Sequence, residues 1–332
     1  MDFVREMKQK AKTLWKKLVL PEGTEPRTVK AAKILVDEEL AAAVILLGKE
    51  SDVQKVAAQH SVDLKGITIV NPSASNLIDK YANQYYEMRK HKGMTPEQAK
   101  IDIVAPLRWG AMMVKMGDAD ALVAGAENTT AEVLRAGLAI IGTTPGSKTA
   151  SSCFVMQIPD NSWGADGALI FSDCAVVPDP SPDQLAEIAV SAAQSCREFL
   201  NAEPAVALLS FSTKGSGGDH PNVKKVQEAL AMIKAKEPKL LVDGELQADA
   251  ALVPSVTETK APGSPIQGKV NTLVFPDLGS GNISYKLVQR LGRAEAFGPF
   301  LQGFAKPISD LSRGASVDDI VVTCAVTLAR AK

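Results

Sequence analysis

The chain has 332 residues, of which 45% are hydrophobic and 23% charged, with a formal net charge of −1. This length suits two hydrophobic cores better than one. The balanced charge argues against a nucleic-acid binder, which needs a basic excess, and no apolar run approaches the ~20 residues of a membrane span. The N-terminus lacks signal-peptide features, and the four cysteines match no metal or redox spacing, so we expect a cytoplasmic protein.

Short apolar runs alternate with helical patterns along the first part of the chain. Strands are expected at 41–49 and 67–72, and strands that run into turns are expected at 16–23 and 120–130. Helices are expected at 27–40 and 50–60, with a long helical stretch over 76–117 that breaks near Gly93. This alternation predicts an α/β protein with mostly parallel sheets covered by helices.

The sequence changes character at 142–156, a link rich in Gly, Pro, Ser and Thr. Beyond it we expect strands at 151–159, 167–173, 205–212, 240–246 and 271–277, and helices at 181–200, 221–236 and 283–292. The last segment, 316–332, reads as a helix without a sheet partner nearby. We therefore predict a discontinuous first domain, 1–145 plus 301–332, and a second domain, 146–300.

Four segments share the order strand, polar or Gly-rich turn, helix start: 121–135, 207–225, 273–286 and 308–321. Free N–H groups at a helix start attract anions, and ligands bind at the carboxyl ends of parallel strands. Any one such loop is ordinary, but four together favour a phosphorylated ligand. The segment 142–149 fails the Walker A spacing, and no complete dinucleotide-binding glycine motif is present.

Several polar residues in these loops have two interpretations. Thr129 and Glu132 fit a capping box, which leaves Arg135, one turn further on, as a surface cation or an anion ligand. Arg89 belongs to a basic helix end, 89–92, and the sequence does not separate it from its neighbours. Ser316 and Asp319 fit a second helix cap.

At these loops the sequence closely resembles the phosphate acetyltransferase (phosphotransacetylase) family, within the phosphate acetyl/butyryltransferases. The resemblance covers nearly the whole chain, through stretches such as LPEGTEPR, YEMRKHKGMT, GAENTTAEVLRAGL, LSFSTKGSG and GPFLQGFAKPISDLSRG. It implies an isocitrate/isopropylmalate-dehydrogenase-like fold, with two α/β domains around a cleft, and a homodimer. The implied activity is that of an acyltransferase.

The implied reaction is acetyl-CoA + phosphate ⇌ acetyl phosphate + CoA, by direct attack of the CoA thiolate in a ternary complex. The resemblance implies no metal or other cofactor, and a functional pairing with acetate kinase. It makes Arg313, Asp319 and Ser312 the catalytic residues. Residues predicted to bind CoA or phosphate are Arg89, Arg135, Asn128, Thr129, Thr130, Ser280 and Asn282.

The resemblance implies a division of labour among the catalytic residues. Arg313 stabilises negative charge on the carbonyl oxygen, and Ser312 hydrogen-bonds the sulfur. Asp319 is the implied base, yet an ordinary Asp, with a pKa of ~3.9, is a poor base for a thiol near 8.5. The sequence leaves open whether Asp319 is the base or only orients Arg313.

Two other functions remain compatible with the sequence. The first is a metal- and NAD(P)-dependent hydroxyacid dehydrogenase, because that chemistry uses the same fold. Its metal ligands would be Asp243, Glu245 and Asp249. The second is a catalytically silent protein that binds CoA or acyl phosphate.

Overall fold

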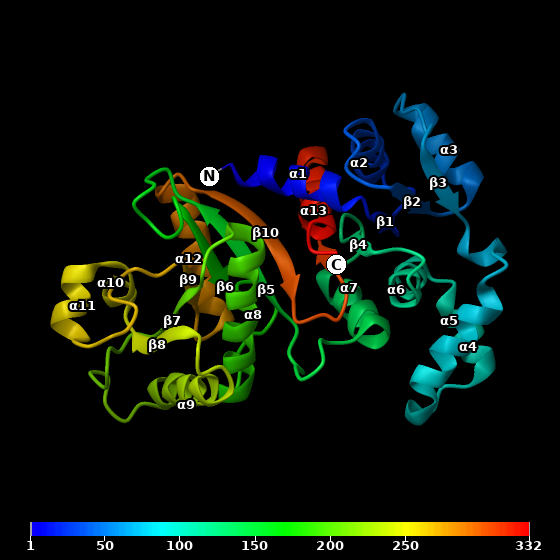
Figure 1. Cartoon of the computed structure of the whole chain (residues 1–332). Helices are drawn as coiled ribbons and strands as arrows, with labels where there is room; N and C mark the ends of the chain where they lie inside the picture. Colours follow the sequence, from blue (N-terminus) through cyan, green and yellow to red (C-terminus); the bar gives the residue numbers. More distant parts are fainter. Residues whose placement is uncertain (1, 332) are drawn as a thin grey trace. The chain divides into compact units, whose positions relative to one another are not determined.

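The computed structural model describes residues 2–331, which form two compact units (Figure 1). The terminal unit consists of residues 2–144 together with the C-terminal segment from 304. The central unit consists of residues 145–303. Among the described residues, no helix has both the length and the apolar character needed to cross a membrane.

The terminal unit is built on a five-stranded sheet with the order β11-β4-β1-β2-β3. Its strands are β1 (Lys17–Leu20), β2 (Ala43–Leu47), β3 (Ile67–Val70), β4 (Ala121–Ala124) and β11 (Ile308–Asp310). Every pairing in this sheet is parallel. The carboxyl ends of all five strands therefore lie along one edge.

One helix of the terminal unit precedes the first strand and the others follow strands in the sequence, and several of them pack on the sheet. The helices are α1 (Phe3–Leu14), α2 (Pro26–Asp37), α3 (Glu50–Gln59), α4 (Ile78–Arg89), α5 (Pro96–Ile103), α6 (Pro106–Met116), α7 (Thr130–Ala136) and α13 (Val317–Leu328). A π-helical turn, Gly137–Ile141, extends α7. Helix α13 packs against α1 and α2, and its Ile320, Cys324 and Leu328 belong to their shared core.

The central unit has a six-stranded sheet with the order β10-β5-β6-β9-β7-β8. Its strands are β5 (Ser151–Gln157), β6 (Ala168–Ser172), β7 (Ala205–Leu209), β8 (Leu241–Leu246), β9 (Thr272–Val274) and β10 (Glu295–Gln302). Strands β5 and β6 pair antiparallel, which confirms the predicted neighbours, and β10 pairs antiparallel with β5. The remaining pairings are parallel, so the prediction of mostly parallel sheets is confirmed.

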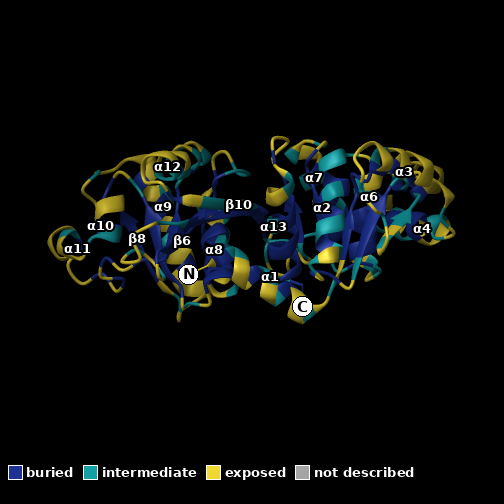
Figure 2. Cartoon of the chain, turned by 90° about the horizontal axis from the view of Figure 1, so that it is seen from above, coloured by how far each residue is buried: buried dark blue, intermediate teal, exposed yellow. Residues whose placement is uncertain are grey.

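Helices α8 (Pro182–Leu200), α9 (Pro221–Lys236), α10 (Ala248–Leu252), α11 (Pro254–Lys260) and α12 (Leu278–Leu291) complete the central unit. The predicted start of α8 is confirmed, since Ser181 caps it in a capping box and Pro182 follows. In both units most strand residues are buried, except in β3 and the first part of β10, and the exposed residues lie mainly on helices and loops (Figure 2).

The structure corrects three expectations. The stretch 76–117 breaks at Gly93, as predicted, but also before Pro106, because proline lacks the N–H that a helix interior needs. Helix α12 starts at Leu278, not near Ile283, so its Gly-rich segment forms the first turn. Strand β10 was not predicted because its Gly and Pro obscure the pattern; the proline is tolerated where the register shifts in an edge strand.

Candidate active site

A buried carboxylate shapes the loop that follows β4. Glu22, in the turn after β1, is only 4% exposed. It accepts hydrogen bonds from the backbone N–H groups of Gly125 (3.0 Å), Ala126 (2.9 Å), Glu127 (3.1 Å) and Asn128 (2.8 Å), and from the Asn128 side chain (2.8 Å). Consecutive N–H groups that converge on one carboxylate leave this loop little freedom, because each loose donor would be buried without a partner.

Arg27, in the first turn of α2, ties the two neighbouring strand-end loops together. Its guanidinium donates to the carbonyl oxygens of Ala126 (2.9 Å), Arg313 (2.8 Å) and Ala315 (2.8 Å). Its Nε pairs with Glu25 at 2.7 Å. The loop after β4 and the turn after β11 are therefore joined by one rigid, forked side chain.

The predicted catalytic turn lies at this joint. Ser312 and Arg313 follow β11 after one buried residue, Leu311, and both are exposed. The Ser312 hydroxyl accepts a hydrogen bond from the Gly314 N–H at 3.2 Å, and the Ser312 carbonyl accepts one from Ala315. Among the described residues, no carboxylate pairs with the Arg313 side chain, so its charge is available to a ligand.

Asp319 occupies the cap of α13. Its Oδ2 accepts from both the N–H and the hydroxyl of Ser316 at 2.8 Å, and its N–H returns a bond to the Ser316 hydroxyl. The capping box expected at Ser316 and Asp319 is thus confirmed. Within the described chain no ion pair joins Asp319 to Arg313.

The loop after β4 runs into a second capping box. Thr129 is the N-cap of α7 and Glu132 closes the box, as expected. Hydrogen bonds from Thr129 lower the pKa of Glu132, and the charges of Arg135 and Arg313 lower it further. The Arg27 hydrogen bonds to Ala126 and Arg313 hold the loop that leads into α7 close to the Arg313 turn.

Asp310, the last residue of β11, is buried below this loop at 3% exposure. Its Oδ2 accepts a hydrogen bond from the Thr130 hydroxyl at 2.5 Å, whereas its Oδ1 is buried without a partner. A side chain at Gly125 would collide with that Oδ1. Burial raises the pKa of Asp310 to about 6, and the negative charge of Glu22 raises it further, whereas the Thr130 hydrogen bond and the nearby Leu311 N–H lower it.

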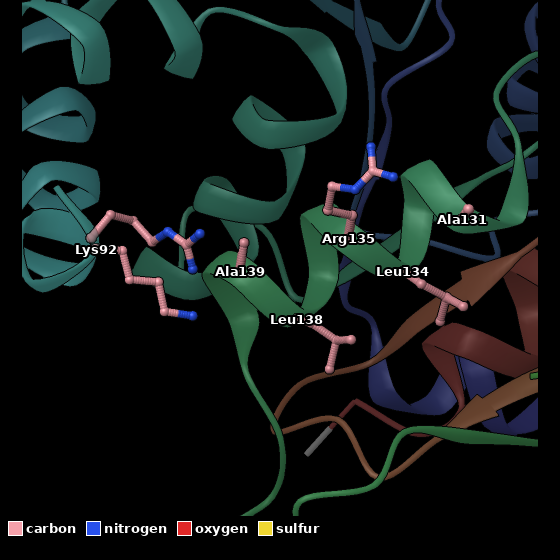
Figure 3. A pocket seen from close by; sticks show the side chains of 7 residues that line it. Lys92, Ala131, Leu134, Arg135, Leu138 and Ala139 are labelled. Atoms are coloured by element: carbon pink, nitrogen blue, oxygen red, sulfur yellow. The ribbon is translucent and has the colours of Figure 1, made fainter. Parts of the chain in front are cut away.

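Arg89, Lys92 and Arg135 line a cavity of about 400 Å³ in the terminal unit. Along α7 and its extension, Arg135 projects from one face, while Leu134 and Leu138 project from another (Figure 3). The three cations make no ion pair with any described residue, and the buried Nε of Arg89 has no hydrogen-bond partner. The cavity therefore combines unpaired positive charge with apolar surface, which suits an organic phosphate.

Ser280 and Asn282 lie in the central unit, in the first turns of α12. The Ser280 N–H donates to the capping residue Asp277 at 2.8 Å, and the Ser280 hydroxyl donates to the Asp277 carbonyl at 2.9 Å. Asn282 donates to the Cys174 carbonyl at 3.1 Å. Their side chains hold the start of α12 to its own unit.

The carboxylates considered as metal ligands already have partners. Asp243 pairs with Lys214 at 2.5 Å, and Asp249 pairs with Lys260 at 2.7 Å. Glu245 accepts bonds from one backbone N–H and two side chains. In the part of the chain that the structure describes, no group of three or more His, Cys, Asp or Glu residues is arranged to bind a metal.

The terminal unit thus brings together seven of the predicted residues: Ser312, Arg313, Asn128, Thr129 and Thr130 at one sheet edge, and Arg89 and Arg135 in one cavity. Sequence reasoning missed Glu22, Arg27, Asp310 and Lys92. Glu22 and Arg27 lie within LPEGTEPR, a stretch that carried the resemblance, but nothing in the sequence indicates that they bind distant backbone groups.

The sequence matches the phosphate acetyl/butaryl transferase family over residues 2–328. The chain belongs to this family. It is 58% identical to a phosphate acetyltransferase of Treponema pallidum, over 99% of this chain and 98% of that protein. This relationship makes the chain an acyltransferase.

Solved structures show the same fold. A phosphotransacetylase from Streptococcus pyogenes superimposes with a TM-score of 0.93 at 42% identity, covering 99% of this acyltransferase and 98% of that chain. A 4-hydroxythreonine-4-phosphate dehydrogenase from Klebsiella pneumoniae is 13% identical with a TM-score of 0.54, covering 95% of this chain and 99% of that one. The second likeness concerns the fold alone, and the predicted dehydrogenase-like fold is confirmed.

Proposed function

We propose that this acyltransferase is a phosphate acetyltransferase, which interconverts acetyl-CoA and phosphate with acetyl phosphate and CoA. The observation that carries the proposal is the joint made by Arg27. It places the exposed, unpaired Arg313 beside the loop of Asn128, Thr129 and Thr130, at the carboxyl edge of a parallel sheet. A fixed cation beside helix-start N–H groups is suited to negative charge that develops on an acyl oxygen.

The proposed mechanism is direct attack of the CoA thiolate on the acyl carbon of acetyl phosphate in a ternary complex. Arg313 stabilises the carbonyl oxygen and Ser312 hydrogen-bonds the sulfur. Arg89 and Arg135 hold phosphate groups as forked donors. Asn128, Thr129, Thr130, Ser280 and Asn282 complete the binding of CoA and phosphate, and holding both substrates together supplies proximity.

Asp319 is the proposed base, or else a residue that supports Arg313. One of its oxygens is engaged by Ser316, which leaves the other oxygen as the proton acceptor. We further propose that the enzyme needs no metal or other cofactor, and that it is a cytoplasmic homodimer paired functionally with acetate kinase. Light scattering would measure the assembly, and a chelator added to the assay would test the cofactor proposal.

The test of function is thioester formation from acetyl phosphate and CoA, repeated with butyryl phosphate. We expect rapid formation with the acetyl substrate and a much lower kcat/KM with the butyryl one. No thioester from either would refute the function, and preference for butyryl phosphate would correct the substrate. Arg313→Gln should lose ~10²-fold or more in kcat if it stabilises the oxyanion; normal turnover in that variant excludes this role.

A further inference from the structure

Asp310 is a buried carboxyl that the proposed mechanism does not use. It ends β11 just before the Ser312-Arg313 turn, and it is 3% exposed. One oxygen accepts from the Thr130 hydroxyl at 2.5 Å, a length typical of a hydroxyl that donates to a carboxylate. The other oxygen is buried with no partner.

This arrangement opposes ionisation of Asp310. Leaving a carboxylate oxygen buried without a donor is costly, and most proteins avoid it. No described cation forms an ion pair with Asp310. Glu22, from the turn after β1, is the charged group that acts on its pKa. The neighbouring helices carry further charged side chains, which are Glu132 and Arg135 on α7 and Asp318 and Asp319 on α13. The pKa of Asp310 is accordingly raised to about 6, mainly by burial.

Asp319 is less suited to take a proton from a thiol. Its Oδ2 is engaged in the cap of α13, and it is exposed to water. A general base works best when its pKa lies near the operating pH. With a pKa of about 6, the Asp310 carboxyl is closer to neutral pH than an ordinary Asp at ~3.9.

Thr130 connects Asp310 to the surface. It is the first residue of α7, and it is partly exposed beside Asn128 and Thr129. Because its hydrogen is directed at Asp310, the hydroxyl oxygen can offer only lone pairs to a ligand. The loop that leads into Thr130 is joined to the Arg313 turn by Arg27. A group that offers lone pairs there is placed to accept the hydrogen of a thiol.

We propose that Thr130 accepts the proton of the CoA thiol and passes its own proton to Asp310, so that this pair is the proton acceptor of the reaction. The S–H bond breaks as the new Thr130 O–H bond forms, and the former hydroxyl proton moves to Oδ2 of Asp310. The thiolate then attacks the acyl carbon, and the C–O bond to phosphate breaks with its electron pair on the phosphate oxygen. The proton on Asp310 returns through Thr130 to that oxygen, so the phosphate leaves as HPO₄²⁻.

This inference rests on the proposed function. Thr130 is the catalytic residue of the pair because it touches the thiol, and Asp310 is a positioning residue that acts through it. Of the two roles proposed for Asp319, the inference leaves support of Arg313 rather than that of the base, and Asp319 still caps α13. The pair also gives a reason for a carboxyl whose burial opposes stability, since such strain is retained where function requires it.

The experiment compares pH profiles of thioester formation from acetyl phosphate and CoA in matched variants. Asp310→Asn keeps the size of the side chain and an oxygen for Thr130, but it cannot take up the proton. We expect a wild-type pH profile with an acidic limb near pH 6. In Asp310→Asn we expect kcat to fall ~10²-fold or more and this limb to be lost. Asp318→Asn, an exposed neighbour of Asp319, should keep the wild-type profile.

Thr130 supplies the second arm. Thr130→Val removes the hydroxyl at constant size and should lose as much turnover as Asp310→Asn, while Thr130→Ser should recover most of it. The double variant Asp310→Asn/Thr130→Val should be no worse than either single variant, because the two residues act as one unit. Circular dichroism verifies that each variant is folded.

The outcomes distinguish failure of this inference from failure of the proposed function. If the wild type forms no thioester, both the proposed activity and the Thr130–Asp310 proton acceptor are wrong. An active wild type whose Asp310→Asn variant keeps its turnover, or loses turnover without any change in the acidic limb, overturns only the inference. If the acidic limb were lost in Asp319→Asn but not in Asp310→Asn, Asp319 and not Asp310 would be the proton acceptor.

Discussion

Lys90 and Lys92 lie in the same short 3₁₀ turn but have different surroundings. Lys90 pairs with Glu87 at 2.5 Å, whereas Lys92 lines the cavity with Arg89 and Arg135. We predict that Lys92→Gln raises the KM for CoA by roughly fivefold to tenfold with little change in kcat, because it removes uniform binding of a phosphate. Lys90→Gln is the matched control. Steady-state kinetics with varied CoA would contradict the assignment if the two variants behaved alike.

Glu22 is a second residue with a single, testable task. Replacement by Gln puts an N–H₂ group among backbone donors that all need an acceptor. Glu22→Gln should therefore lower the free energy of unfolding by about 2–4 kcal/mol. Glu127→Gln, an exposed change in the same loop, should stay within about 0.5 kcal/mol of the wild type. Urea denaturation measures both, and equal stability of the two variants would rule out this role for Glu22.

At the scale of elements, two serines precede α13 and have separable roles. Ser316 caps the helix, so Ser316→Ala should cost about 1 kcal/mol of unfolding free energy. Ser312 makes only a local turn contact, so Ser312→Ala should stay within about 0.5 kcal/mol while losing turnover. Urea denaturation and steady-state assays on the two variants would show which serine caps the helix and which acts in catalysis. The reverse pattern would assign the cap to Ser312 and catalysis to Ser316.

Elements with a strong local signal were predictable. The cap at Ser181 followed by Pro182 predicted the start of α8, and apolar runs predicted β1 and β2. Strand β10 was not predictable, because a strand that contains Gly298 and Pro299 is recognised only by its pairing with β5. Pairing between distant segments is tertiary information, and local patterns do not contain it.

The residues of the candidate site also divide into those that local sequence patterns predict and those that only the folded structure reveals. Thr129 and Ser316 were predictable as caps because a cap depends on residues three positions apart. Glu22, Arg27 and Asp310 act on groups about 100 or more positions away, so their spacing carries no signal. Catalytic side chains often have recognisable motifs, whereas the residues that hold their loops in place are found only in the folded chain.

At the scale of the whole molecule, Asp310 links folding to pH. Its pKa is about 6 in the folded chain and 3.8 as a free side chain, so the folded state binds the extra proton between these values. The stabilisation of the folded state by this proton is complete below pH ~4. It is lost as the pH rises through 6, and the total loss in unfolding free energy is roughly 3 kcal/mol. Asp310→Asn has no such proton. As the pH rises from 4 to 7, the unfolding free energy of the variant should therefore increase relative to that of the wild type. Urea denaturation across this range measures the difference, with Asp318→Asn as the control that should run parallel to the wild type. A constant difference between Asp310→Asn and the wild type would show that this carboxyl does not change its protonation on folding.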